Sequence, residues 1–115
     1  MAGYSKKIKA QFRKLVDEAY ERELARELRL LAAQFDEWRA GRISAGELSY
    51  RVHQYDKGPA REMHSLYNLM DQEFVIARAV VEELLTEDEI PEDVWPHIRD
   101  MVQGLRRYRN GEGER

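Results

Sequence analysis

The sequence contains no cysteine at any of its 115 positions. Disulfide bonds, thiolate metal sites, cysteine-ligated iron–sulfur clusters and cysteine nucleophiles are therefore excluded. The absence of cysteine is compatible with a reducing compartment, and we expect the protein to be cytoplasmic by default.

Long apolar runs are also missing. No window approaches the ~18 to 20 apolar residues that a membrane-spanning helix needs. The basic segment 1–14 lacks the apolar stretch of ~7 to 15 residues that is typical of a signal peptide. We therefore expect no leader, no spanning segment and no membrane partner.

Charge of one sign does not dominate either. There are 19 lysines and arginines against 22 aspartates and glutamates, a formal net charge of −3, which argues against a surface built throughout to hold a phosphate backbone. Hydrophobic residues make up 43% and charged residues 36%, a mixture typical of a folded helical protein. A chain of this length normally forms one domain. We expect a single helical domain over 1–109 and a disordered tail over 110–115.

Proline and glycine are absent from residues 5–40, where apolar side chains recur in steps of three and four. This spacing predicts one long amphipathic helix. Its stripe consists of Ile8, Phe12, Val16, Tyr20, Leu24, Leu28, Leu31, Phe35 and Trp38. At ~1.5 Å per residue such a helix is about 50 Å long, longer than a compact domain of this mass covers. One end therefore protrudes or pairs with a second copy, and Gly41 is placed to end the helix.

Two further helices are predicted from capping signals. Ser44 and Glu47 have the spacing of a capping box, which predicts a short helix over 45–55. Proline fits the first turn of a helix, so Gly58-Pro59 predicts the start of a third helix that continues to about Leu85.

The last part of the chain carries similar signals. Thr86 and Glu89 again have capping-box spacing, and a fourth helix is predicted over 91–108, with Pro96 in its first turn. The expected fold is all-α: an up-down helical bundle of three to four helices with a long N-terminal helix.

The junction between the second and third helices gathers side chains that can carry chemistry. The candidate catalytic residues are His53, Asp56, Arg61, Glu62 and His64. One hypothesis is a metal-dependent hydrolase, in which His64 approaches His53 and Asp56 closely enough to share a metal ion. Another is an acid/base hydrolase or nuclease that uses an imidazole with Arg61. The H-E-x-x-H motif is absent, and no cofactor is predicted.

The same junction allows an anion-binding interpretation. Lys57, Arg61 and the free backbone N–H groups of a helix start are suited to a phosphate or a partner's carboxylate. For every one of these hypotheses the competing interpretation is ordinary capping and surface hydrogen bonding.

Basic residues at both chain ends raise the possibility of nucleic-acid binding. The two sets are Lys6, Lys7, Lys9, Arg13 and Lys14 near the start, and Arg106, Arg107 and Arg109 near the end. A phosphate-binding surface requires both sets to lie together. The acidic stretch over 82–93 offers an alternative, in which it attracts these basic residues or a basic partner.

With long amphipathic helices and no compact catalytic motif, the sequence favours an interaction or regulatory protein. We expect it to dock a helical face on a protein partner or on itself, as a homodimer. The hydrolase and the nucleic-acid-binding protein are the two alternatives.

Overall fold

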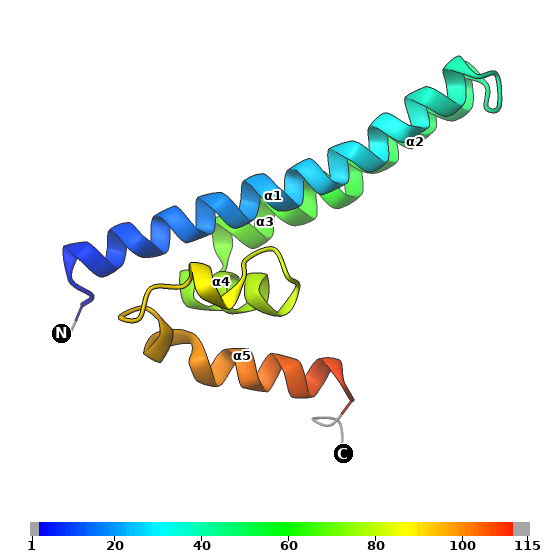
Figure 1. The fold of residues 1–115 in the computed structure, drawn as a ribbon. Coiled ribbons are helices and arrows are strands. Elements are labelled where there is room, and N and C mark those ends of the chain that lie inside the picture. The colour runs from blue at the N-terminus through cyan, green and yellow to red at the C-terminus, as the bar shows by residue number, and fades with distance from the viewer. Residues whose placement is uncertain (1–2, 112–115) are drawn as a thin grey trace.

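The structure is a computed structural model that describes residues 3–111, and this range is helical without a strand (Figure 1). In chain order its elements are α1 (Lys6–Arg39), α2 (Ala45–Tyr55), the π-helical turn η1 (Asp56–Ala60), α3 (Arg61–Leu69), α4 (Gln72–Val81), the 3-10 turn η2 (Glu87–Glu89) and α5 (Trp95–Arg109). The predicted all-α bundle with a long N-terminal helix is confirmed.

Both ends of α1 are capped as their residues predict. At the start, the Ser5 hydroxyl accepts a hydrogen bond from the Ile8 N–H at 3.1 Å, which satisfies one of the free donors of the first turn. At the end, Gly41 adopts a φ of 76°. The N–H groups of residues 41 and 42 bond to the carbonyls of Trp38 and Glu37, both at 2.9 Å. This is the Schellman ending, which favours glycine in the left-handed position.

The predicted start of a third helix at Pro59 is wrong. Tyr55, Ala60 and Arg61 all have right-handed helical backbone angles, so α2, η1 and α3 form one continuous segment antiparallel to α1 (Figure 1). A proline inside a helix lacks an N–H, and its ring crowds the carbonyl four residues earlier. The wider π-helical turn accommodates this misfit, and Gly58 has no Cβ to clash with the proline ring.

The helix that was predicted to continue to Leu85 instead breaks at Met70 and Asp71. Both residues are extended, with ψ angles of 156° and 141°. The chain turns there, and α4 passes beneath the first half of α1 (Figure 1). Tertiary packing explains the break, because the turn buries six residues of α4: Val75, Ile76, Ala77, Ala79, Val80 and Val81.

The hydrophobic core lies between the first half of α1, α4 and α5, a unit that we call the head. From α1 it takes Ile8, Phe12, Leu15, Val16 and Ala19, and from the last part of the chain it takes Leu84, Leu85, Ile90, Val94, Ile98 and Val102. None of the buried residues from α1 lies beyond Ala19. The second half of α1 is therefore outside the core.

That second half of α1 pairs with α2 and projects beyond the head. We call residues 24–55 the arm (Figure 1). Leu48 is the buried residue that α2 contributes. The molecule measures 56 × 38 × 26 Å, and its longest dimension matches the ~51 Å expected for a helix of this length. The predicted protrusion of one helix end is thus present.

The predicted capping box at Thr86 is confirmed, and it opens η2. The Glu89 carboxylate accepts from the Thr86 N–H at 2.8 Å. Helix α5 begins at Trp95 rather than Pro91, because Pro91 instead starts a turn whose carbonyl accepts from the N–H groups of Val94 and Trp95.

At the other end of α5, Asn110 and Gly111 form the turn that closes the helix. The rest of the predicted tail, 112–115, lies outside the described residues. Among the helices of residues 3–111, none is both long and apolar enough to span a bilayer.

Candidate functional site

The candidate catalytic residues all lie on the α2–η1–α3 segment and are exposed. His53 is on α2, Asp56 begins η1, and Arg61, Glu62 and His64 are on α3. Because this segment is one helix, the eleven-residue step from His53 to His64 separates their backbones by about 16 Å along the axis. Two imidazoles that share a metal each lie ~2 Å from it. His53 and His64 therefore lie too far apart to share a metal ion, contrary to the metal hypothesis.

The surfaces around these residues are separate as well. Asp56, Arg61 and His64 line one shallow groove of about 410 Å³, whereas Glu62 lines another, next to Arg78. Within the described part of the chain, no group of three or more histidine, aspartate or glutamate side chains is placed to hold a metal ion. The structure therefore brings Asp56, Arg61 and His64 to one groove and leaves His53 and Glu62 outside it.

The anion hypothesis also loses its basis. It relied on free N–H groups at a helix start, but the helix is continuous here and the Arg61 N–H bonds to the Gly58 carbonyl. His64 has a local contact instead. The Asn68 amide donates to the His64 carbonyl at 2.7 Å and lies 3.3 Å from its Nδ1 atom.

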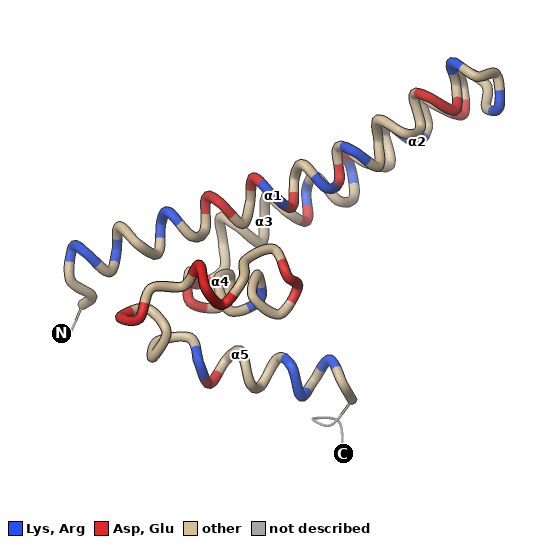
Figure 2. Tube along the Cα trace, in the orientation of Figure 1, with Lys and Arg blue, Asp and Glu red and all other residues tan. Residues whose placement is uncertain are grey.

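The two basic sets do not form one surface. Figure 2 shows the lysines and arginines at the start of α1 and those at the end of α5 on opposite ends of the head. Two of the C-terminal arginines contact the acidic stretch of the same chain. Arg106 pairs with Glu87 at 2.9 Å, and Arg109 lies 3.6 Å from Glu82 and also donates to the Val81 carbonyl at 2.7 Å. Intramolecular pairing thus uses charges that the nucleic-acid hypothesis needs for phosphate.

The arm exposes apolar side chains along α1. One surface, which we call the arm face, is a shallow hollow of about 280 Å³ lined by Leu28, Leu31, Ala32, Phe35, Asp36 and Arg39. Leu28 is 45% exposed, and the neighbouring Trp38 is 43% exposed. All six lining residues belong to α1, so within residues 3–111 no other element covers this surface.

The arm face points away from the head. At 100° per residue, Leu28 and Ala32 lie on the opposite side of α1 from Phe12 and Ala19, which enter the core. The same side of α1 is polar farther toward the N-terminus, where it carries Arg13, Lys14, Asp17, Glu18 and Glu21. The large apolar side chains that α1 exposes on this side, such as Leu28, lie on the arm.

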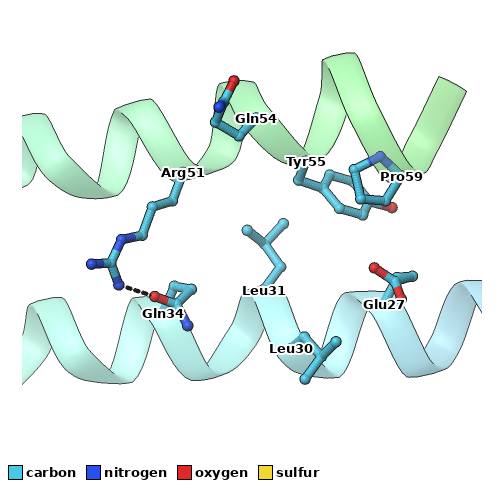
Figure 3. A pocket seen from close by; sticks show the side chains of 8 residues that line it. All are labelled: Glu27, Leu30, Leu31, Gln34, Arg51, Gln54, Tyr55 and Pro59. Carbon is cyan, nitrogen blue, oxygen red and sulfur yellow. Dashed lines mark hydrogen bonds between the residues drawn. The ribbon is translucent and has the colours of Figure 1, made fainter.

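A second groove lies between α1 and α2 (Figure 3). Leu31 and Tyr55 point into it from opposite helices, and its other lining residues are Glu27, Leu30, Gln34, Arg51, Gln54 and Pro59. The Arg51 guanidinium donates to the Gln34 side chain across the groove. Polar side chains surround this groove and the Arg51–Gln34 hydrogen bond crosses it, so it is not an open apolar surface.

A half-buried charge network fixes the base of the arm. Arg78 of α4 binds both carboxylate oxygens of Glu23, and the Tyr67 hydroxyl donates to the same carboxylate at 2.7 Å. Burial raises the pKa of Glu23, but the hydrogen bonds from Arg78 and Tyr67 outweigh it and the pKa lies below its usual value. Glu23 is thus held as the charged form where α1, α3 and α4 meet.

A second network ties α1 to the loop before α5. The Arg22 guanidinium binds both oxygens of Glu89 at 2.7 and 2.8 Å and donates to the Leu84 carbonyl at 2.8 Å. These contacts hold α1 in a fixed rotation about its own axis relative to the head. The direction of the arm face follows from that rotation.

Comparison with known proteins gives no further guide to the site: no family model, curated protein or solved structure matches this chain.

The amphipathic pattern predicted a docking helical face, but it did not locate that face on the second half of α1. The spacing predicted a single apolar stripe that includes Leu24, Leu28, Leu31, Phe35 and Trp38. One helix partner covers only part of that stripe. A usable signal was present in the small residues Ala25 and Ala32, which lie beside the stripe and widen the apolar side of the helix beyond what one neighbour can cover.

Proposed function

We propose that the protein is an interaction protein that uses its arm face to bind an amphipathic helix of another protein molecule. The observation that carries the proposal is the apolar hollow on α1, which faces away from the head and is left uncovered by the other described elements of the chain. A helix with an unpartnered apolar side normally buries it against a further element. The cytoplasmic location expected from the sequence is retained as part of the proposal.

The shape of the arm face selects a helix as its occupant. From Leu28 to Arg39 the arm face extends over about 17 Å, the length of three helical turns. Leu28 and Phe35 alternate with Ala32, so large side chains on either side of a small one leave a hollow for a partner's side chain. Helix-in-groove binding uses anchors at this spacing.

Charges at the edge of the arm face define the partner further. Arg29 and Asp36 are both exposed and lie one above the other on the same edge of α1. A partner helix that carries an acidic and a basic residue seven positions apart complements both. Such rim charges contribute orientation more than affinity.

The decisive experiment compares two leucines of α1. Leu28 lies on the arm face, whereas Leu30 is 60% exposed and lines the groove between α1 and α2. Native mass spectra of gently purified wild type, Leu28→Glu and Leu30→Glu report which molecules remain bound. We expect the wild type and Leu30→Glu to retain a protein partner or a second copy, and Leu28→Glu to be a free monomer with an unchanged circular dichroism spectrum.

Hydrogen exchange locates the contact independently. In the complex, amides of residues 25–39 should exchange more slowly than in Leu28→Glu, while those of α5 should be unaffected. A wild-type protein that is monomeric and free of bound protein under all conditions overturns the proposal. Loss of binding in Leu30→Glu alone would place the contact in the other groove.

A further inference from the structure

We infer that the helix bound by the arm face is α1 of a second copy of this chain, packed antiparallel to the first. This inference rests on the proposed function and specifies its partner. A two-fold axis perpendicular to the two α1 helices relates the copies, and it lies level with the midpoint between Ala33 and Gln34. Each arm face then serves as both the surface and its ligand.

Antiparallel packing at this register matches large residues with small ones. Phe35 of one copy faces the partner's Ala32, and the two-fold axis repeats the contact. Leu31 faces the partner's Trp38, whose side chain is 43% exposed in the single chain. A contact of this kind covers side chains that α2 leaves open.

The same register pairs opposite charges at the edge of the arm face. Arg29 of one copy lies beside the partner's Asp36, and the symmetry-related contact gives a second such pair. In the single chain, the Asp36 carboxylate pairs with Arg39 at 3.0 Å, and both side chains are highly exposed. Asp36 therefore remains available to a partner.

Parallel packing is disfavoured by Arg39. In a parallel, in-register pair, Arg39 at the end of the arm face meets the partner's Arg39, and two guanidinium groups repel. In the antiparallel pair it lies over the partner's Leu28, where its aliphatic stem covers the leucine and its charged end reaches water.

The head places no obstacle in the way of this dimer. The arm face is on the side of α1 opposite the residues that enter the core, so each head lies on the outside, and the antiparallel arrangement puts the two heads at opposite ends. A single helix face about 17 Å long and about 10–12 Å wide is smaller than the ~800 Å² per partner of a standard interface. We therefore expect a reversible dimer with a Kd in the range of about 1–100 μM.

The first test is a charge exchange followed by sedimentation equilibrium at 5–500 μM. Arg29→Asp and Asp36→Arg each place two like-charged pairs in the dimer, and we expect each to weaken dimerisation about tenfold. The double variant Arg29→Asp/Asp36→Arg restores opposite charges and should return the Kd to within about threefold of wild type. Both positions are exposed, so an unchanged melting temperature of the monomer shows that folding is not the cause.

The second test measures orientation. Since the chain lacks cysteine, a single introduced cysteine carries a spin label at a defined position. The two labels of an Ala33→Cys dimer lie at nearly the same level along the helices whether the dimer is antiparallel or parallel, so this variant gives the reference distance. Labels at Ala40→Cys should be about 20 Å farther apart in the antiparallel dimer but equally close in a parallel one.

The outcomes separate the inference from the proposed function. A protein that stays monomeric at 500 μM but binds a different protein through Leu28 overturns the inference and leaves the proposed function standing. A dimer that is indifferent to the charge exchange, or that brings the labels at position 40 together, also overturns it. Absence of any complex overturns both.

Discussion

Glu23 and Arg78 join α1 to α4 through a two-point ion pair, with Nη1–Oε1 and Nη2–Oε2 distances of 2.9 and 3.0 Å. Their side chains are only 17% and 27% exposed. Tyr67 of α3 donates to the same carboxylate. One carboxylate therefore binds three helices together at the point where the arm leaves the head.

We expect Glu23→Gln to lower the free energy of unfolding by about 2 kcal/mol, because it leaves a half-buried guanidinium without its counter-charge. Tyr67→Phe removes one hydrogen bond to a charged acceptor and should cost about 1 kcal/mol. Urea denaturation measures both. Glu27→Gln, one turn farther along α1, is the matched control and should change the free energy of unfolding by less than about 0.5 kcal/mol. Equal effects at positions 23 and 27 would contradict the assigned network.

The Glu89 carboxyl gives the structure a defined response to acid. Hydrogen bonds from the Arg22 guanidinium and, second, from the Thr86 N–H lower its pKa from 4.5 to about 2. A carboxyl with a depressed pKa stabilises the fold above its unfolded-state value, and that contribution is lost as the pH falls through the folded value. We therefore expect Glu89 to contribute stability at neutral pH and to lose it between about pH 5 and pH 2.

Carbon-13 NMR titration of the Glu89 carboxyl measures the pKa directly. Unfolding midpoints recorded from pH 7 to pH 2 for wild type and Glu89→Gln should converge as the pH falls. Glu92→Gln, in the same acidic stretch, controls for a general loss of negative charge. A Glu89 resonance that titrates near 4.5 would show that the contact with Arg22 does not persist in solution.

Replacement of two glycines by alanine should change the free energy of unfolding in opposite directions. Gly104 lies inside α5, and a Cβ there meets no atom within 4 Å, so Gly104→Ala should raise the free energy of unfolding by about 1 kcal/mol. Gly41 has a φ of 76°, and Gly41→Ala should lower it by about 1 kcal/mol. Thermal unfolding at neutral pH distinguishes the two. A stabilising Gly41→Ala would mean that α1 does not end in the left-handed turn.

Glu83 occupies a position that favours glycine. Its φ is 63°, and it follows α4 in the Schellman pattern, in which the Leu84 N–H bonds to the Ala79 carbonyl at 2.8 Å. We expect Glu83→Gly to raise the free energy of unfolding by about 0.5–1 kcal/mol, because relief of the left-handed strain exceeds the entropy cost of glycine. Glu83→Gln removes the charge while it keeps the strain, and it should leave stability nearly unchanged. Chemical denaturation of both variants separates backbone strain from acidic repulsion.

Local signals predicted much of the fold. Gly41 and Thr86 act through contacts within a few residues, so the end of α1 and the cap of η2 were both accessible to sequence reasoning. The same reasoning failed at Pro59, because a π-helical turn admits proline where an α-helix does not. It also failed at Met70, where the apolar spacing continues across a break that only the packing of α4 explains.

The candidate site was less predictable for the same reason. The junction hypothesis depended on His53 and His64 meeting across a turn, and once η1 makes the segment continuous they are held apart. The arm face depends on which side of α1 remains uncovered. That is a property of the position of α2, and periodicity within α1 does not contain it.

The separation of head and arm along one helix has a consequence for the order of folding. In the chain, 55 residues separate Ala19 of α1 from Val75 of α4, and both lie in the core. Closing a loop of that length before any other contact has formed is entropically costly. If the hairpin of α1 and α2 closes first, through the short turn at residues 40–44, it brings α3 and then α4 back along α1. We expect the arm to form early and the core to follow, so that the part of the molecule farthest from its hydrophobic centre guides the assembly of that centre.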